Sequence, residues 1–220
     1  MKTIDLNCDL GESFGPFTVG NDEQIIPYVT SINAACGFHA GDPSVMEKTI
    51  QLAKKYDVAI GAHPGYQDLS HFGRRNIPTT PRETYQLVLY QLGALNAFCR
   101  ANDVGLHHVK PHGALYNVAA NDKNIASAIA SAVKDFDETL LLYGLSNSEL
   151  ILAGDAAGLQ TVSEVFADRT YEKNGTLTPR TLEGSVIHNP NEAIEQVRQM
   201  VLDGEVTSRL GSVIKIKADT

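Results

Sequence analysis

Short apolar runs alternate with amphipathic stretches along most of this chain. Between the runs, apolar residues recur at three-to-four spacing, for example at Val88, Leu92 and Leu95 or at Ile125 and Ile129, which is typical of helices that cover a core. The runs are strand-sized and cover residues 2–9, 29–36, 58–63, 106–110, 139–143, 160–166 and 212–217. Strand followed by helix, repeated, predicts an α/β protein with a mainly parallel sheet.

Capping signals predict where several of the helices begin. Asp42-Pro43 has the pattern of an N-cap followed by a first-turn proline, and residues 80–83, 146–149 and 189–192 have the pattern of capping boxes. Asn121 is a fifth candidate cap. These starts fix the order of helices between the apolar runs.

Polar residues occupy one face of at least two of the predicted strands. Asp5, Asn7 and Asp9 alternate with apolar residues, and His108 and Lys110 alternate in the same way. An open, doubly wound sheet is covered on both faces and favours continuous apolar strands. Amphipathic edge strands would also explain one such face, but we favour a deformed (β/α) barrel of seven or eight mainly parallel strands with a polar lumen.

The chain is expected to form one domain over residues 1–220, because no Gly/Ser-rich linker, charge block or low-complexity stretch divides it. Only residues 218–220 follow the last apolar run. A (β/α) barrel would continue into a final helix, and it needs about 250 residues. We therefore expect a barrel that is truncated at its C-terminus.

Composition narrows the classes of partner. The net charge of -8 and pI of about 5.3 argue against nucleic acid or an anionic membrane as a partner. The chain has no signal-peptide pattern and no run of eighteen apolar residues, so we expect a cytoplasmic protein. Cys8, Cys36 and Cys99 fit neither a disulfide framework nor a metal-binding pair and are expected to be reduced.

Four strand ends carry glycine together with ionisable groups: residues 9–12, 37–42, 61–65 and 109–117. In βα-loop enzymes the strands hold such groups in place and the loops expose them. The repetition predicts one site at the C-terminal mouth of the sheet.

Candidate catalytic residues come from three of these strand ends. Asp9 and Glu12 flank a glycine and together could supply a general base, although a turn cap and a solvated side chain explain them as well. His63 and His112 each stand beside a proline at a strand end, and Lys110 shares a strand face with His112. Either histidine alone is more often structural; with Lys110 they form a site hypothesis.

Candidate substrate-binding residues surround this set. His39 lies between two glycines, which suggests close approach to an anion at the following helix start, where Asp42 also serves as a cap. Arg74, Arg75 and Arg169 could grip a carboxylate or phosphate, with solvated surface arginines as the alternative. The full set of substrate-binding candidates is Asn7, His39, Asp42, Arg74, Arg75, Tyr116, Asn117 and Arg169.

Several phosphate-binding and hydrolase motifs are missing from the sequence. It contains no GxxxxGK[ST], GxGxxG, HExxH or GxSxG pattern. A P-loop for ATP, a dinucleotide fold, zincin chemistry and an esterase elbow therefore lose support.

The motifs together closely resemble the LamB/YcsF family. The residues that carry the resemblance are Asn7 to Glu12, Cys36 to Asp42, Gly61 to Tyr66, Phe72 to Arg75, Val109 to Asn117 and Glu164 to Arg169. The resemblance implies a deformed β/α barrel related to glycoside hydrolases and deacetylases. It also implies ATP-coupled opening of 5-oxoproline to L-glutamate together with partner subunits B and C.

The cofactor and partner expectations follow from that resemblance. ATP would be a co-substrate, with Mg²⁺ for the nucleotide, and no tightly bound protein metal is expected. Family members continue past residue 220 into a strand with a Cys-x-His-Gly-Asp motif and a last helix. Homo-oligomerisation is left open.

Two other functions fit the same residues. One is a metal-dependent deacetylase or carbohydrate-active hydrolase with Asp9, His63 and His112 as ligands. The other is a non-catalytic subunit that only holds substrate for its partners.

Overall fold

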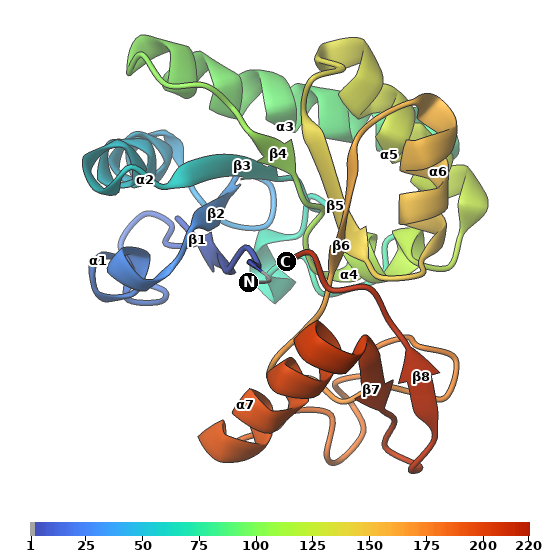
Figure 1. Ribbon diagram of the computed structural model, residues 1–220. Coiled ribbons are helices and arrows are strands. Elements are labelled where there is room, and N and C mark those ends of the chain that lie inside the picture. The colour runs from blue at the N-terminus through green and yellow to red at the C-terminus, as the bar shows by residue number, and fades with distance from the viewer. Residues whose placement is uncertain (1–2) are drawn as a thin grey trace.

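The computed structural model describes residues 3–220 and contains a curved sheet of six parallel strands (Figure 1). Each strand pairs with the next one in sequence, so the order in the sheet is β1-β2-β3-β4-β5-β6. The strands are β1 Asn7–Leu10, β2 Ser31–Ala35, β3 Ala59–His63, β4 His108–Val109, β5 Leu141–Leu145 and β6 Thr161–Glu164. Consecutive parallel strands joined by helices confirm the predicted α/β class and its deformed-barrel architecture.

Helices connect these strands and cover the outer face of the sheet, as Figure 1 shows for α2, α3, α5 and α6. The α-helices are α1 Asp22–Ile25, α2 Pro43–Tyr56, α3 Pro81–Ala101, α4 Gly113–Ala119, α5 Lys123–Phe136, α6 Glu149–Ala157 and α7 Pro190–Arg198. Short helical turns are η1 Ile26–Tyr28, η2 Leu69–His71 and the π-helical η3 Gln199–Asp203.

The main hydrophobic core lies between the sheet and these helices. Ile32 of β2, Leu92 of α3 and Ile129 of α5 are fully buried in it. Burying side chains of this size contributes about 1.5–3 kcal/mol each. The opposite face of the sheet carries buried polar side chains, among them Asn33 and His108. The alternation of polar and apolar residues therefore predicts the polar lumen correctly.

The predicted helix caps are confirmed at three places and shifted at two. Asp42, Thr80 and Asn189 each accept hydrogen bonds from the first turn of their helix. The cap of α6 is Ser148, because the Ser146 hydroxyl instead accepts from the Lys217 amide.

The cap of α5 is also later than predicted, by one residue. Asp122 accepts from the amides of Asn124 and Ile125, whereas Asn121 donates its side-chain amide to the Asn117 carbonyl. An Asn next to an Asp makes either residue a good cap by type, so sequence could not separate them.

The last predicted strand does not join the parallel sheet. Within 212–217, β8 covers Val213–Lys215 and pairs antiparallel with β7, Glu205–Thr207. The run has strand-forming residues, but the residues before β8 supply an antiparallel partner closer in sequence than β6. Eight strands are thus present among the described residues, six in one parallel sheet and two in a separate ribbon.

Residues 219–220 lie between β6 and the segment before β1, which brings the C-terminus beside Asp5. The Asp219 amide donates to the Ser163 carbonyl at 2.9 Å, and the Asp5 amide donates to the Asp219 carbonyl at 3.2 Å. The Val165 amide donates to the Thr220 carbonyl at 2.9 Å. This segment therefore bridges the two edges of the curved sheet.

A second hydrophobic cluster holds the segment after β6 together. Tyr171, Leu177, Met200, Val206 and Ile216 are buried in it. With α7, β7 and β8 it forms the part below the sheet in Figure 1, which we call the C-terminal lobe, residues 165–217. The single domain over residues 1–220 stays a prediction.

The structure also describes the state of the cysteines and the length and hydrophobicity of the helices. Cys8, Cys36 and Cys99 are free thiols, as predicted. No helix within residues 3–220 combines the length and the apolar character needed to cross a bilayer.

Candidate active site

A buried lysine occupies the centre of the polar lumen. The Lys110 ammonium lies 2.7 Å from Glu164 Oε1, 3.1 Å from Asp9 Oδ1 and 3.0 Å from Asn7 Oδ1. Burial alone would lower the pKa of Lys110, but the two carboxylates outweigh it and raise that pKa above its ordinary value. Lys110 therefore stays charged, with its three protons directed at three oxygens.

Asp9 is the acidic partner of this lysine at the mouth. Its carboxylate also accepts from Asn33 Nδ2 at 2.9 Å and lies 3.3 Å from His63 Nε2. Burial would raise the pKa of Asp9, but His63 and Lys110 more than compensate and hold that pKa well below its ordinary value. Asp9 is ionised at neutral pH.

His63 and His112 face one another nitrogen to nitrogen, with His63 Nε2 2.9 Å from His112 Nδ1. The far nitrogen of each ring contacts a backbone carbonyl: His63 Nδ1 donates to Lys110 O at 2.7 Å, and His112 Nε2 donates to Phe72 O at 2.8 Å. A carbonyl only accepts, so both far nitrogens carry their proton. Burial and the neighbouring His63 and His39 rings lower the pKa of His112 to about 2.

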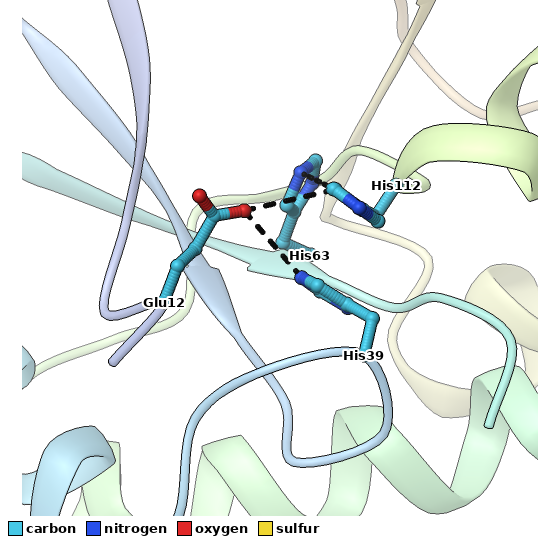
Figure 2. A group of neighbouring side chains, drawn as sticks. All are labelled: Glu12, His39, His63 and His112. Carbon is cyan, nitrogen blue, oxygen red and sulfur yellow. Dashed lines mark hydrogen bonds and ion pairs between the residues drawn. The ribbon is translucent and has the colours of Figure 1, made fainter. Parts of the chain in front are cut away.

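Glu12 and His39 complete a compact group with these two histidines (Figure 2). Glu12 Oε1 lies 3.6 Å from His39 Nε2 and 3.7 Å from His112 Nδ1. The His39 ring is fully buried and stacks on His112 with 3.7 Å between centroids. Burial raises the pKa of Glu12 to about 7 and holds the pKa of His39 well below its ordinary value. We call Glu12, His39, His63 and His112 the histidine cluster.

Backbone contacts between loops of neighbouring strands bring the cluster together. The Gly41 amide donates to the Ser13 carbonyl at 3.1 Å, which joins the loop after β2 to the loop after β1. The His112 amide donates to the Pro64 carbonyl at 2.8 Å, which joins the loops after β4 and β3. Loops at the carboxyl ends of parallel strands thus converge, as predicted from the repeated motifs.

Because Gly65 and Gly73 lack side chains, the stacked rings of His39 and His112 can pack against them. A Cβ at Gly65 would lie 2.8 Å from His39 Nδ1, and one at Gly73 would lie 2.8 Å from His112 Cδ2. Gly73 also has a φ of +63°, which side-chain-bearing residues rarely adopt. The two positions tolerate no side chain without displacing a cluster histidine.

A cavity of about 930 Å³ opens between the sheet mouth and the C-terminal lobe. Asp9, His63, Lys110 and His112 line its inner end. Its other walls carry Arg74, Tyr116, Asn117, Phe166, Arg169, Lys173 and Arg180. A cavity of this size holds a small metabolite, and its cationic walls suit an anionic one.

Arg169 is held rigidly on the wall of this cavity. Its Nε donates to the Ser185 carbonyl at 3.1 Å and its Nη2 donates to the Thr178 carbonyl at 2.6 Å. Burial and the nearby Arg180 lower its pKa from the ordinary value. The side chain is buried, and these two hydrogen bonds fix its orientation on the wall.

Three predicted substrate-binding residues lie elsewhere in the described chain. Asp42 uses one carboxylate oxygen to cap α2 and the other to accept from the Gly15 amide. Arg75 pairs with Asp68 and is absent from the cavity lining. Asn7 donates its amide to Glu164 and Thr220 within the lumen.

Glu12 and His39 are also absent from the cavity lining among residues 3–220, although they lie beside His63 and His112, which do line it. The sequence alone suggests Asp9, His63 and His112 as a possible ligand set. In the structure Asp9 is engaged by Lys110 and Asn33, and Glu12 with His39 completes the group instead.

Sequence reasoning missed two residues of the lumen network. Asn33 donates to Asn7 Oδ1 and Asp9 Oδ1, and its own oxygen contacts His108 Nε2 at 2.8 Å. Glu164 is the last residue of β6 and pairs with Lys110. An Asn inside an otherwise apolar run and a Glu at a strand end were the available signals.

Comparisons with known proteins agree with this architecture. The LamB/YcsF family matches residues 4–220. The A subunit of the 5-oxoprolinase from Geobacillus thermodenitrificans is 59% identical over 220 residues, covering 100% of this chain and 86% of that protein. The corresponding 5-oxoprolinase A subunit from Bacillus subtilis is 56% identical, with the same coverage.

The fold of this chain also closely matches that of a solved structure. The lactam utilization protein from Thermus thermophilus superimposes with a TM-score of 0.95 at 47% identity, covering 100% of this chain and 89% of that one. The family match covers residues 4–220, and both relatives and this structure cover 100% of this chain. The chain belongs to the LamB/YcsF family.

Proposed function

We propose that this chain is the A subunit of a 5-oxoprolinase, which hydrolyses the lactam of 5-oxoproline to L-glutamate with ATP hydrolysis. The observation that carries the proposal is the convergence of Asp9, His63, Lys110 and His112 on one cavity, in a chain 59% identical to a 5-oxoprolinase A subunit. The lactam utilization protein of the same fold supports a cyclic amide as substrate.

The chemistry of the substrate explains the need for ATP. A five-membered lactam is a poor electrophile, and phosphorylation of its oxygen activates the carbonyl carbon. The overall change consumes 5-oxoproline, ATP and two waters and yields glutamate, ADP and phosphate. Subunits B and C, with Mg²⁺ for the nucleotide, would handle ATP alone or jointly with this chain.

Asp9 is the proposed proton acceptor. One water forms a bond to the activated carbon and loses a proton to Asp9; the C–N bond then breaks, and the nitrogen takes up the protons that this water supplied, which leaves γ-glutamyl phosphate. The second water cleaves the acyl phosphate bond and gives glutamate and phosphate. Asp9 is ionised and lines the cavity, unlike Glu12. General bases positioned in this way contribute about 10²–10⁴-fold to rate.

Lys110 and the arginines are the proposed anion-binding groups. The Lys110 protons are engaged by Glu164, Asp9 and Asn7, so Lys110 acts on the cavity through its charge, which can stabilise negative charge that develops on the carbonyl or phosphoryl oxygens. Arg74 and Arg169 line the same cavity and suit the substrate carboxylate. Tyr116 and Asn117 complete the proposed substrate contacts, whereas Asn7 positions Lys110.

An ATP-dependent 5-oxoproline assay with and without subunits B and C tests the proposal. We expect glutamate release that requires ATP, this chain and both partners. Glutamate release that is unchanged when this chain is left out would refute it.

Replacing Lys110 by Met separates catalysis from mere substrate holding. Loss of a fixed charge that stabilises the transition state should lower kcat by about 10²–10³-fold. The measurement is steady-state turnover with saturating 5-oxoproline and both partners, with thermal unfolding as the control for folding. A raised KM with kcat intact would favour a subunit that only binds substrate.

A further inference from the structure

The two facing histidines of the histidine cluster need a positive group between them. Both His63 and His112 donate a proton from the far nitrogen to a carbonyl. If both rings are neutral, the near nitrogens, 2.9 Å apart, each present a lone pair to the other. Two lone pairs at that distance repel unless a proton or a metal ion lies between them.

The other two members of the cluster distinguish a metal ion from a proton. Neither nitrogen of His39 has a hydrogen-bond partner among the described residues, although the ring is fully buried. Glu12 Oε1 is buried and lacks a hydrogen-bond partner in the same part of the chain. A proton shared by His63 and His112 satisfies neither of them, and leaving such buried groups unpaired is unfavourable.

The spacing of the four donors matches the coordination shell of a small ion. Ligands held about 2.0–2.1 Å from a tetrahedral metal lie about 3.4 Å from one another. Three of the donor separations, 2.9, 3.6 and 3.7 Å, lie on both sides of that value. All four donor atoms lie within 4.8 Å of one another (Figure 2).

We propose that the histidine cluster binds one divalent transition-metal ion of the Zn²⁺ class. Three imidazoles and one carboxylate are ligands that Zn²⁺ and similar ions favour, whereas Mg²⁺ and Ca²⁺ favour all-oxygen shells. The backbone carbonyls of Lys110 and Phe72 supply the outer contacts that orient metal-bound histidines in known sites. This proposal departs from the sequence-based expectation of no tightly bound metal.

The proposed ion has a place in the chemistry of the cavity. His63 and His112 belong both to the cluster and to the cavity wall beside Asp9. With four ligands from the cluster, a tetrahedral ion would fix the His63 and His112 rings in the cavity wall beside Asp9; this role rests on the proposed function, whereas binding of the ion does not.

Calorimetric titration of the chelator-treated full chain with Zn²⁺ tests the proposal without substrate or partner subunits. Co²⁺ is the second probe, because its visible absorption reports nitrogen and oxygen ligation. The variants are Glu12→Gln, which keeps the side-chain shape, and His39→Ala; the matched control is His188→Ala, an exposed histidine outside the cluster. Circular dichroism of each metal-free variant reports folding.

We expect one equivalent of Zn²⁺ per chain, bound at least about 100-fold more weakly by His39→Ala and at least about 10-fold more weakly by Glu12→Gln, with His188→Ala unchanged. No Zn²⁺ binding, or binding that survives unchanged in both cluster variants, would overturn the proposal. Because the readout is binding, an inactive enzyme with intact Zn²⁺ affinity would count against the proposed function and not against the metal site.

Discussion

Asp9 and Asp42 both follow strands in glycine-containing motifs, yet their carboxylates serve different purposes. Asp9 accepts from Lys110 and Asn33 at the cavity wall. Asp42 accepts from Ser44 and Val45 at the start of α2. The proline after Asp42 was the sequence signal for a cap, and it predicts the cap correctly.

Asp42→Ala should therefore affect stability and leave turnover intact. Losing this N-cap is expected to lower the free energy of unfolding by about 1 kcal/mol. Urea denaturation measures the stability, and 5-oxoproline turnover in the assembled enzyme measures the activity. A large loss of turnover without a change in stability would make Asp42 a substrate-binding residue again.

Arg74 and Arg75 are neighbours of the same residue type, yet only one of them lines the cavity. Arg74 lines the cavity, whereas Arg75 pairs with Asp68. Both follow Gly73, and sequence alone could not tell which one faces inward, because Phe72 and Gly73 both have positive φ and redirect the chain.

At the scale of elements, the segment Asp68–Arg75 acts as a strap across the histidine cluster. The Asp68 carboxylate accepts from the Arg75 side chain and backbone, and the Asp68 carbonyl accepts from the Gly73 amide at 2.9 Å. This folds the strap so that the Phe72 carbonyl accepts from His112 Nε2. Arg75 thus contributes by holding the strap.

Asp68→Asn should loosen the strap without unfolding the chain. We expect kcat/KM to fall by about 3- to 10-fold, on the scale of a lost charge-assisted hydrogen bond. Glu138→Gln, which removes an exposed ion pair with Lys134 on α5, is the matched control. Equal activity of the two variants would show that the strap plays no part in positioning His112.

The same ion pair sets a pH dependence for the strap. Hydrogen bonds from Arg75 hold the pKa of Asp68 below its ordinary value. A lowered carboxyl pKa stabilises the folded form above the ordinary value of about 3.9 and loses that effect as the pH falls through the lowered pKa. Amide hydrogen exchange of residues 68–75, corrected for intrinsic rates, should stay constant from neutral pH down to about 5 and increase only at stronger acidity.

The alternation of polar and apolar residues along the strands predicted the polar lumen but could not predict the partner of the last strand. Side chains alternate along any strand, so Asp5, Asn7 and Asp9 had to share a face. Alternation says nothing about which strand is the neighbour. Hence β8 could be identified as a strand, whereas its antiparallel pairing with β7 required the structure.

At the scale of the whole molecule, one buried polar network joins distant parts of the sheet. Asn33 of β2 links Asn7 and Asp9 of β1 to His108 of β4. The Thr220 hydroxyl and the Asn7 amide extend the network to the end of the chain. The family resemblance predicted the barrel, but the partners of a fully buried Asn depend on sheet curvature, which no local pattern encodes.

Asn33→Ala tests whether this network supports the sheet. The change removes three hydrogen bonds and leaves His108 without its Asn33 partner, so we expect a loss of about 3 kcal/mol in unfolding free energy. Urea denaturation measures it, with the exposed Asn191→Ala as control. A loss below about 1 kcal/mol would mean that water replaces Asn33 in the lumen.

The C-terminal lobe supplies one wall of the cavity. Phe166, Arg169, Lys173 and Arg180 belong to it and line the cavity opposite Asp9. The second hydrophobic cluster, which includes Tyr171 and Met200, holds these residues in place. Substrate binding should therefore depend on the lobe and proton transfer on the sheet.

Lactam hydrolysis by the assembled enzyme should depend on the ionised Asp9 at the sheet mouth. The decisive experiment is glutamate release by Asp9→Asn, assembled with subunits B and C and supplied with ATP and 5-oxoproline. The control is Asp57→Asn, an exposed residue at the end of α2 whose positive φ suits Asn. We predict a loss of kcat of about 10³-fold for Asp9→Asn and none for Asp57→Asn; near-normal turnover by Asp9→Asn would show that Asp9 is not the base.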